Sequence, residues 1–511
     1  MTRLKSSIRS LTALFAVSFL AVGCAQLPQD APAVAGTNLT AGVSANLLPF
    51  YNQKVSWSSC FTTMKCGTVK VPMDWANPGT ATLNLAVIYH DPTGSSLGSL
   101  FMNPGGPGGS GYDFIRDSLS SAASAAVVKR YRMVGWDPRG VGKSDPVKCY
   151  GPKATDSLLY DVSGYPANSA KDLAASKAQQ LSFLAACKKN TGTKLAYVDT
   201  VSASRDMDIL RVVMGEPKLN LLGYSYGTFL GATYATLYPQ NVGKFVLDGA
   251  TDPTVSDEQQ SLNQLFGFDS AFKAYIAQCI GQKTCPLYGL TQATAIKRIQ
   301  GLLLKLETTS LPTQDGRRLT AAGALTGMLF TLYSKTYWKY LTQGLSQAFN
   351  GDGSTLILLA DAYNGRNEDG SYSGNELEAN VAVNCLDNRS SSKTADMIAQ
   401  NAKVMATSQL LGRYWKWGGL GCLGWPKAHT VSPKSYAATG AGPILVLGTT
   451  NDPATPYKQS VHMAQVISSA HLITLHGEGH TAYIQGNACV DKAVDAYLLN
   501  GTVPAKDPDC K

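Results

Sequence analysis

The sequence predicts an α/β fold in which a mostly parallel central sheet carries an inserted, mainly helical cap. Three observations predict this fold. Short apolar runs typical of strands alternate with helix-like stretches over residues 51–250, and again over residues 433–511. Between these two parts, residues 251–432 lose the alternation and contain helix-like stretches instead. A serine flanked by glycines stands at a strand-to-helix turn before the insertion.

That turn is the most informative stretch of the chain. Residues 223–227 read Gly-Tyr-Ser-Tyr-Gly, after a short apolar run and before a stretch with small residues on one helical face. A G-x-S-x-G between a strand and a helix is the nucleophile elbow of an α/β-hydrolase. The two glycines let strand and helix cross closely. Ser225 is therefore the candidate nucleophile, and the N–H of Tyr226 is the candidate donor to an oxyanion.

A second glycine-rich segment supports the same chemistry. Residues 103–111 read Asn-Pro-Gly-Gly-Pro-Gly-Gly-Ser-Gly and follow the strand-like run 100–102. Bare backbone at this place lets a substrate approach, and hydrolases of this fold put their second oxyanion donor there. A phosphate cradle is disfavoured because no Lys-Ser/Thr pair follows at the required spacing.

The remaining catalytic groups follow strands near the end of the chain. Asp452 comes after the strand-like run 444–447, and His480 lies between glycine and threonine after the run 472–475. A serine hydroxyl needs an imidazole to take its proton, and the imidazole needs a carboxylate to fix its tautomer. The order Ser, Asp, His is that of α/β-hydrolases. We therefore predict Ser225 as nucleophile, His480 as acid and base, and Asp452 as the orienting acid.

Two of these roles have alternatives. Asp248 and Asp252 also follow a strand-like run, so either is an alternative acid. The chain has six histidines, and His476 is the nearest competitor of His480, although it ends a strand-like run.

The insertion between nucleophile and acid is where a hydrolase of this fold carries its cap. The helix-like stretches predicted in it are 261–280, 291–306, 321–332, 336–349 and 395–411. Polar breaks separate some of them, at 352–353 and 364–374.

Composition excludes several other classes of protein. Only 15% of the 511 residues are charged, against roughly a quarter in soluble proteins, and this style is common in exported proteins. The net charge of +9 is not gathered in a basic run, so no nucleic-acid partner is indicated. No H-E-x-x-H and no paired C-x-x-C occurs, so we expect no metal and no cofactor.

The N-terminus has the pattern of a targeting segment. Residues 1–23 combine three basic residues with the apolar stretch 11–22, which is shorter than the roughly 20 residues of a membrane span. The segment ends Leu-Ala-Val-Gly before Cys24, which resembles a bacterial lipobox. We predict a signal peptide over 1–23, lipidation of Cys24 and a flexible tether over 24–50. Ordinary signal cleavage, giving a freely secreted enzyme, is the alternative.

Cysteine usage agrees with export. Removing Cys24 from the eleven cysteines leaves ten, an even number as expected in an oxidising compartment. Buried free thiols are the alternative. Because connectivity does not follow from sequence alone, we hypothesise sequential pairing, in which each bridge closes a local loop: Cys60–Cys66, Cys149–Cys187, Cys279–Cys285, Cys385–Cys422 and Cys489–Cys510.

Five motifs in fixed order resemble one known family. They lie at 103–111, 135–142, 223–228, 452–456 and 479–481. Together they resemble the secreted tripeptidyl aminopeptidases of actinomycetes, a group that includes a mycobacterial cell-envelope serine protease and is related to the proline iminopeptidases. The resemblance spans nearly the whole chain after the N-terminal segment. It implies an α/β-hydrolase with a helical cap that releases short peptides from free N-termini.

The resemblance also implies roles for individual residues. Gly106 and Tyr226 would supply the amides of the oxyanion hole. An aminopeptidase must bind a free α-ammonium group, so its cap should hold a carboxylate near the catalytic residues. The candidate is Asp387, in a segment that resembles the family's cap motif, with Glu376 and Glu378 as alternatives.

Three functions compete at this stage. The leading one is an exported serine exopeptidase that releases short peptides, most plausibly tripeptides, from peptide or protein N-termini, held at a membrane by lipid on Cys24. The second is a serine esterase or lipase, because a triad determines acyl transfer but not the acyl group. The third is a non-catalytic envelope lipoprotein that only binds, which a complete triad disfavours. Oligomeric state is not indicated.

Overall fold

The computed structural model describes residues 38–387 and 390–511, and residues 38–511 form one unit. The predicted signal peptide, Cys24 and the first part of the predicted tether lie outside the described residues. In the part of the tether that is described, Val43 and Leu47 pack against the core and Phe50 is buried in it. The Tyr51 hydroxyl donates to Asp208 at 3.1 Å.

A ten-stranded sheet runs through the described residues in the order β1-β2-β3-β5-β4-β6-β7-β10-β11-β12. The first three strands and β5 pair antiparallel, whereas every pairing from β5 to β12 is parallel. The central strands are apolar on both faces, as expected for parallel strands covered on two sides. The strands are β1 (Ser58–Cys60), β2 (Met64–Pro72), β3 (Thr82–His90), β4 (Ser99–Asn103), β5 (Arg132–Trp136), β6 (Leu219–Tyr224), β7 (Val242–Asp248), β10 (Ile444–Asn451), β11 (Ala470–Glu478) and β12 (Asp509–Cys510).

Helices cover both faces of this sheet, and each face has its own apolar cluster. Side chains cap several of these helices; Ser110, for example, accepts from the N–H of Asp113 at the start of α3. The helices outside the predicted insertion are α2 (Leu48–Tyr51), α3 (Gly111–Ala122), α4 (Ala125–Arg130), α5 (Pro152–Tyr160), α6 (Ala170–Thr191), α7 (Thr200–Val213), α8 (Tyr226–Leu237), α16 (Lys458–Val466) and α17 (Ala488–Asn500).

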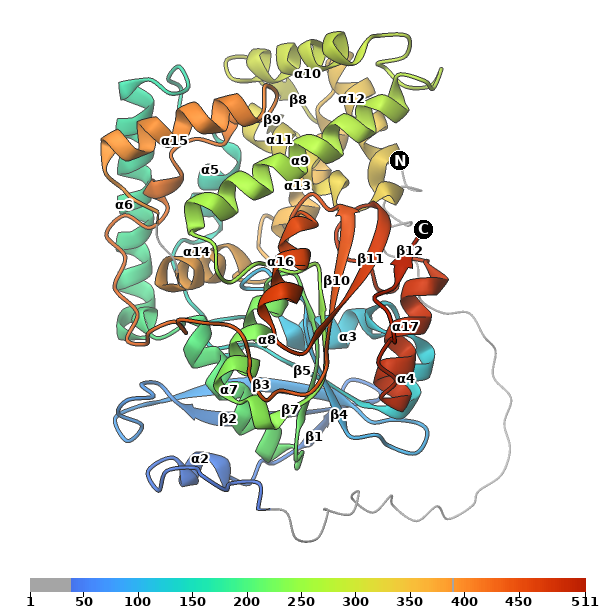
Figure 1. Ribbon diagram of the computed structural model, residues 1–511. Helices are drawn as coiled ribbons and strands as arrows, with labels where there is room; N and C mark the ends of the chain where they lie inside the picture. Colours follow the sequence, from blue (N-terminus) through green and yellow to red (C-terminus); the bar gives the residue numbers. More distant parts are fainter. Residues whose placement is uncertain (1–37, 388–389) are drawn as a thin grey trace, which may run out of the picture. The chain divides into compact units, whose positions relative to one another are not determined.

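Between β7 and β10 the chain leaves the sheet and forms a helical cap with a third apolar cluster. Figure 1 shows α9 to α12 together above strands β2 to β7. Helices occur at each of the five predicted stretches, but α13 and α14 fall outside those predictions. The cap contains α9 (Asp257–Cys279), α10 (Gln292–Leu306), the hairpin β8 (Leu311–Pro312) and β9 (Arg318–Leu319), α11 (Ala321–Leu332), α12 (Trp338–Phe349), α13 (Ser354–Asn364), α14 (Glu376–Asp387) and α15 (Thr394–Thr407).

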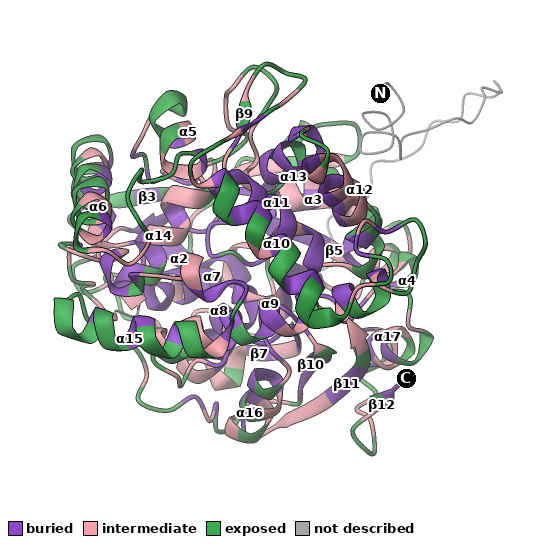
Figure 2. Ribbon diagram, turned by 90° about the horizontal axis from the view of Figure 1, so that it is seen from above, coloured by how far each residue is buried: buried purple, intermediate pink, exposed green. Residues whose placement is uncertain are grey.

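Helices α5 and α6 precede the nucleophile in sequence yet contact the cap. The Tyr160 hydroxyl donates to Asp361 at 2.7 Å, and Gln180 donates to the carbonyl of Gly421 at 2.6 Å. Figure 2 shows the outward faces of α6, α10 and α15 exposed. The segment between β5 and α7 therefore widens the cap, while the boundaries predicted at 250 and 432 stay predictions.

The ten cysteines outside the N-terminal segment form five bridges, in the sequential pattern hypothesised above. They are Cys60–Cys66, Cys149–Cys187, Cys279–Cys285, Cys385–Cys422 and Cys489–Cys510. Among residues 38–387 and 390–511, the helices are all too short or too polar to cross a membrane.

Candidate active site

Ser225 occupies a strained turn between β6 and α8. Its φ of 54° and ψ of −122° are backbone angles that residues other than glycine rarely adopt. The neighbouring structure holds the backbone in this conformation. The N–H of Ser225 donates to the carbonyl of Asp248 at 2.8 Å. A Cβ on Gly223 would lie 2.5 Å from the carbonyl oxygen of Gly227, so this close crossing requires glycine.

Asp452 and His480 come together from the loops after β10 and β11. The Nδ1 atom of His480 lies 2.8 Å and 2.9 Å from the two carboxylate oxygens of Asp452, which is 2% exposed. Backbone N–H groups of Ala454 and Thr455 donate to Oδ1 of Asp452 at 2.9 Å and orient it.

The other nitrogen of this imidazole, Nε2, is the one that would exchange a proton with Ser225 in the predicted triad. His480 Nε2 is buried and has no hydrogen-bond partner among the described residues. Burial disfavours the imidazolium, but the adjacent Asp452 carboxylate outweighs that effect and raises the pKa of His480 above its ordinary value. The pair can accept a proton at Nε2 and hold the resulting charge.

The alternative acids and base have other partners. The Asp248 carboxylate accepts from the N–H groups of Ala482 and Tyr483, each at 2.8 Å, so it holds the backbone just after His480. Burial raises the pKa of Asp248 to about 7 against these two bonds. Asp252 lies 2.6 Å from His462.

His476, the alternative base, lies 2.5 Å from Asp509 near the surface. The histidine that the structure pairs with Asp452, the predicted orienting acid, is His480.

The glycine-rich loop packs directly on the elbow. A Cβ on Gly105 would lie 2.7 Å from the carbonyl oxygen of Tyr224 and 2.8 Å from Cβ of Ser225. Gly105 also has a φ of 101°, which favours glycine. Sequence reasoning did not single out Gly105, because the pattern does not say which of the five glycines in residues 103–111 meets the serine. The oxyanion-hole roles of Gly106 and Tyr226 stay predictions.

Helix α14 of the cap forms a wall beside the same loop. The Asn380 side chain donates to the carbonyl of Pro107 at 3.0 Å. A Cβ on Gly108 would lie 2.7 Å from the carbonyl oxygen of Glu376. Just before the helix, the Asn375 side chain donates to the carbonyls of Gly140 and Val147 and accepts from the N–H of Gly142, at 2.8–2.9 Å.

The three candidate anchors for a substrate amine all lie on α14, in different surroundings. The Asp387 carboxylate accepts from the N–H of Thr200 at 2.8 Å and from its hydroxyl at 2.5 Å, so it caps α7. Burial raises the pKa of Asp387 to about 7. Glu376 is exposed at the start of the helix, and Glu378 is half-buried. Partial desolvation raises the pKa of both glutamates.

One cap residue that the sequence did not single out touches His480, the predicted catalytic histidine. The carbonyl of Tyr333 accepts from the backbone N–H of His480 at 2.8 Å, and Ser334 forms an isolated β-bridge with Gly479. The Tyr333 ring lies edge-on to the imidazole, with 5.5 Å between centroids. The cap therefore helps to position His480.

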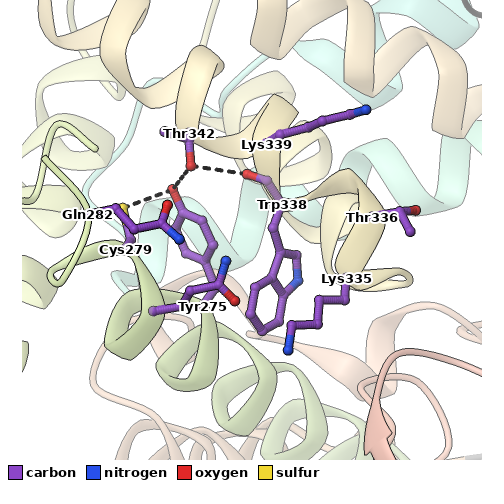
Figure 3. Close-up of a pocket in the computed structure, with 9 residues that line it drawn as sticks. Tyr275, Cys279, Gln282, Lys335, Thr336, Trp338, Lys339 and Thr342 are labelled. Carbon is purple, nitrogen blue, oxygen red and sulfur yellow. Dashed lines mark hydrogen bonds between the residues drawn. The ribbon is translucent and has the colours of Figure 1, made fainter. Parts of the chain in front are cut away.

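The larger of two notable cavities lies inside the cap. Its volume is about 220 Å³, and it is lined by residues of α9 and α12 with Lys335 at one side. Figure 3 shows the rings of Tyr275 and Trp338 facing this space, with Gln282 beside Tyr275. None of the three triad residues lines it. Over the described ranges, no three His, Cys, Asp or Glu side chains gather as a metal site.

A serine at a nucleophile elbow, a His–Asp pair on the loops of two later strands and a mostly parallel sheet define a serine hydrolase of the α/β-hydrolase fold. Residues 408–510 match the family model described as TAP-like protein. The chain belongs to this family of tripeptidyl aminopeptidase-like serine hydrolases, because relatives at 30–37% identity match it along almost its whole length.

Three relatives illustrate this similarity. "Serine protease Hip1" of Mycobacterium tuberculosis is 34% identical, over 98% of this chain and 96% of its own. "Carboxylesterase B" of the same organism is 37% identical over 95% of each chain. "Tripeptidyl aminopeptidase" of Streptomyces lividans is 30% identical, over 89% of this chain and 86% of its own.

Proposed function

We propose that this serine hydrolase is an exported exopeptidase that releases tripeptides from free N-termini through an acyl-enzyme on Ser225. The observation that carries the proposal is the buried His480, paired with Asp452 at Nδ1 and unpartnered at Nε2. A relative named tripeptidyl aminopeptidase supports the peptide substrate.

The proposed reaction has two halves. Ser225 Oγ attacks the scissile carbonyl carbon while Nε2 of His480 takes its proton, and Asp452 stabilises the imidazolium. The N–H groups of Tyr226 and Gly106 donate to the oxyanion. His480 then returns the proton to the leaving amine as the C–N bond breaks. A water molecule, deprotonated by His480, cleaves the acyl-enzyme, and the serine regains its proton.

Recognition of the free N-terminus is assigned to α14. A substrate ammonium group near the catalytic residues needs a carboxylate partner. Asp387 is occupied by Thr200, whereas Glu376 is exposed and its backbone packs against Gly108 of the glycine-rich loop. These contacts favour Glu376 over Asp387 as the anchor. Glu378, two residues further along α14, is the matched control.

Export is part of the proposal. Five bridges suit an oxidising compartment. A signal peptide over 1–23 would export the enzyme, and a lipid on Cys24 would hold it at the cell envelope. Each CH₂ group that an acyl chain buries in the membrane contributes about 0.8 kcal/mol to membrane binding. Detergent partitioning of the native protein, and release of a Cys24→Ser variant, test the anchor. Soluble native protein would favour simple secretion.

A serine esterase is the second candidate. A relative at 37% identity is named carboxylesterase B, and the same triad would transfer an acyl group from an ester.

The deciding experiment compares one fluorogenic tripeptide with a free and an acetylated N-terminus. We expect kcat/KM to be at least 100-fold higher for the free form, and Ser225→Ala to abolish both turnover and fluorophosphonate labelling. Glu376→Gln should raise KM about tenfold or more with little change in kcat, while Glu378→Gln leaves KM unchanged. Equal rates on both forms, or turnover of esters alone, would favour the esterase.

A further inference from the structure

An aromatic cluster of the cap reaches the catalytic histidine and is open to solvent at its far end. The Tyr333 ring lies 5.5 Å from the His480 ring, and the Tyr363 ring lies 6.0 Å from that of Tyr333. Phe330 packs 6.1 Å from Tyr363. We call Phe330, Tyr333 and Tyr363 the aromatic wall.

The wall is built by two packed helices. Phe330 belongs to α11, Tyr333 follows its last residue and Tyr363 lies near the end of α13. From behind, Phe268 of α9 packs 5.7 Å from Tyr333. Tyr363 has aromatic neighbours on one side, yet 47% of its surface is exposed. A large apolar ring that is fixed on one side and exposed on the other is suited to contact a ligand.

The wall also extends toward the acidic end of α14. Burial is the main cause that raises the pKa of the Tyr333 phenol, followed by the neighbouring Tyr363 hydroxyl, and the charges of Asp452 and Glu376 add smaller increases. Glu376 likewise contributes to the raised pKa of Tyr363, after desolvation. Charges interact noticeably at this strength only over short distances. Tyr333 thus adjoins His480 through its ring and its carbonyl, and the charge of Glu376 acts on both Tyr333 and Tyr363.

The size of the wall matches a short peptide. Two successive ring-to-ring steps of 5.5 Å and 6.0 Å lead from His480 to Tyr363. An extended chain advances ~3.3 Å per residue, so these two steps reach no further than a segment of about three residues. If Glu376 binds the amine and Ser225 attacks the scissile carbonyl, the residues to be released would pass the wall, so the side chains that the wall would contact are those on the acyl side of the scissile bond.

We propose that the aromatic wall is a specificity subsite that selects peptides carrying a large apolar or aromatic side chain among the residues to be released. The inference rests on the proposed exopeptidase function and adds the substrate class to it. Tyr363 supplies the exposed ring face, and Phe330 and Tyr333 hold it in place. The wall acts on substrate choice, and the proton transfers remain with the triad.

Free-N-terminus tripeptidyl-aminomethylcoumarin substrates test this, with each of the three positions changed in turn from Ala to Phe. We expect kcat/KM to rise at least tenfold with Phe at one or more positions. Tyr363→Ala should bring that ratio close to one while changing the all-Ala substrate less than threefold. Tyr363→Phe should keep the preference. Tyr288→Ala, at an equally exposed tyrosine (49%) outside the wall, should behave as wild type.

Two results would overturn the wall as a subsite: equal use of Ala and Phe at all three positions, or a preference that survives Tyr363→Ala in a folded variant. Both leave the exopeptidase proposal standing. If peptides are not cleaved at all, that proposal fails, and p-nitrophenyl 3-phenylpropanoate against p-nitrophenyl butyrate then tests the wall. A preference for the aromatic ester that Tyr363→Ala removes supports the subsite, and equal rates refute it.

Discussion

Replacement of Asp452 by Asn is the sharpest test of the assigned triad, because the surroundings determine how the new amide will lie. Two backbone N–H groups, of Ala454 and Thr455, donate to Oδ1. The amide oxygen of Asn must therefore take the Oδ1 position, which leaves its NH₂ group at the Oδ2 position. That position lies 2.8 Å from Nδ1 of His480.

An NH₂ group there reverses the hydrogen bond. It donates to Nδ1, so the proton of the neutral imidazole moves to Nε2, the nitrogen that must accept from Ser225. A triad forced into this tautomer loses about 10⁴-fold in kcat, equivalent to ~5 kcal/mol of transition-state stabilisation. Folding should be affected modestly, because the two backbone bonds to Oδ1 are kept and the Thr455 hydroxyl can accept from the amide, whereas the N–H of Thr481, 3.3 Å from Oδ2, loses its acceptor.

The assay measures kcat of Asp452→Asn on a free tripeptide substrate, with melting temperature as the check on folding. Asp248→Asn is the matched control, because Asp248 is equally buried beside the same loop but bonds to backbone N–H groups of Ala482 and Tyr483. Losing one such charged hydrogen bond costs about 1.5–3 kcal/mol of folding stability, so this variant should melt at a lower temperature while its kcat falls far less than that of Asp452→Asn. Near-normal kcat in Asp452→Asn with a 10⁴-fold loss in Asp248→Asn would refute the reasoning.

Three further predictions follow from the same geometry. Gly105→Ala should abolish turnover and fluorophosphonate labelling together, because its Cβ would lie 2.8 Å from that of Ser225. Gly151 has open space around it, so Gly151→Ala should be active. An active Gly105→Ala would contradict the packing of the loop. Since the neutral form of His480 is the base and the pKa of His480 is raised, kcat/KM should increase with pH through a midpoint above 6.5. Asp248→Asn removes a nearby negative charge and should move that midpoint down. An unshifted or raised midpoint would show that this charge does not act on the imidazole. Non-reducing peptide mapping of the enzyme should find five sequential disulfides, and free thiols or crossed pairs would disprove the pairing.

The catalytic core was readable from the sequence because its signals are local. The strand-like runs at 219–222 and 444–447 lie within β6 and β10, and continuous apolar stretches of that length are typical of strands buried on both faces. The chain order of Ser225, Asp452 and His480, each in a loop after a strand, indicated one edge of the sheet. These signals predicted the fold class and the hydrolase family, and the similarity to known members of that family confirms both.

The cap side of the site was not readable, because its contacts join residues distant in sequence. Helix α14 was missed, since its buried residues are mostly small and its partner is the loop around Pro107, more than 250 residues away. Asp387 has a suitable carboxylate in a suitable segment, but sequence does not reveal that Thr200 occupies it. Likewise, nothing local to Tyr333 indicates that its carbonyl accepts from the catalytic histidine.

The three ties of α14 have a consequence for minimal versions of this enzyme. Asn375, Asn380 and Asp387 join one cap helix to three core segments, around Gly140, at Pro107 and at Thr200. Excising the cap and joining β7 to β10 by a short linker would leave the Pro107 carbonyl and the Thr200 N–H without their side-chain partners and open the back of the glycine-rich loop to water. The hydrolase core is thus not a separable module here, and substrate range is better altered by residue exchange within the cap than by truncation.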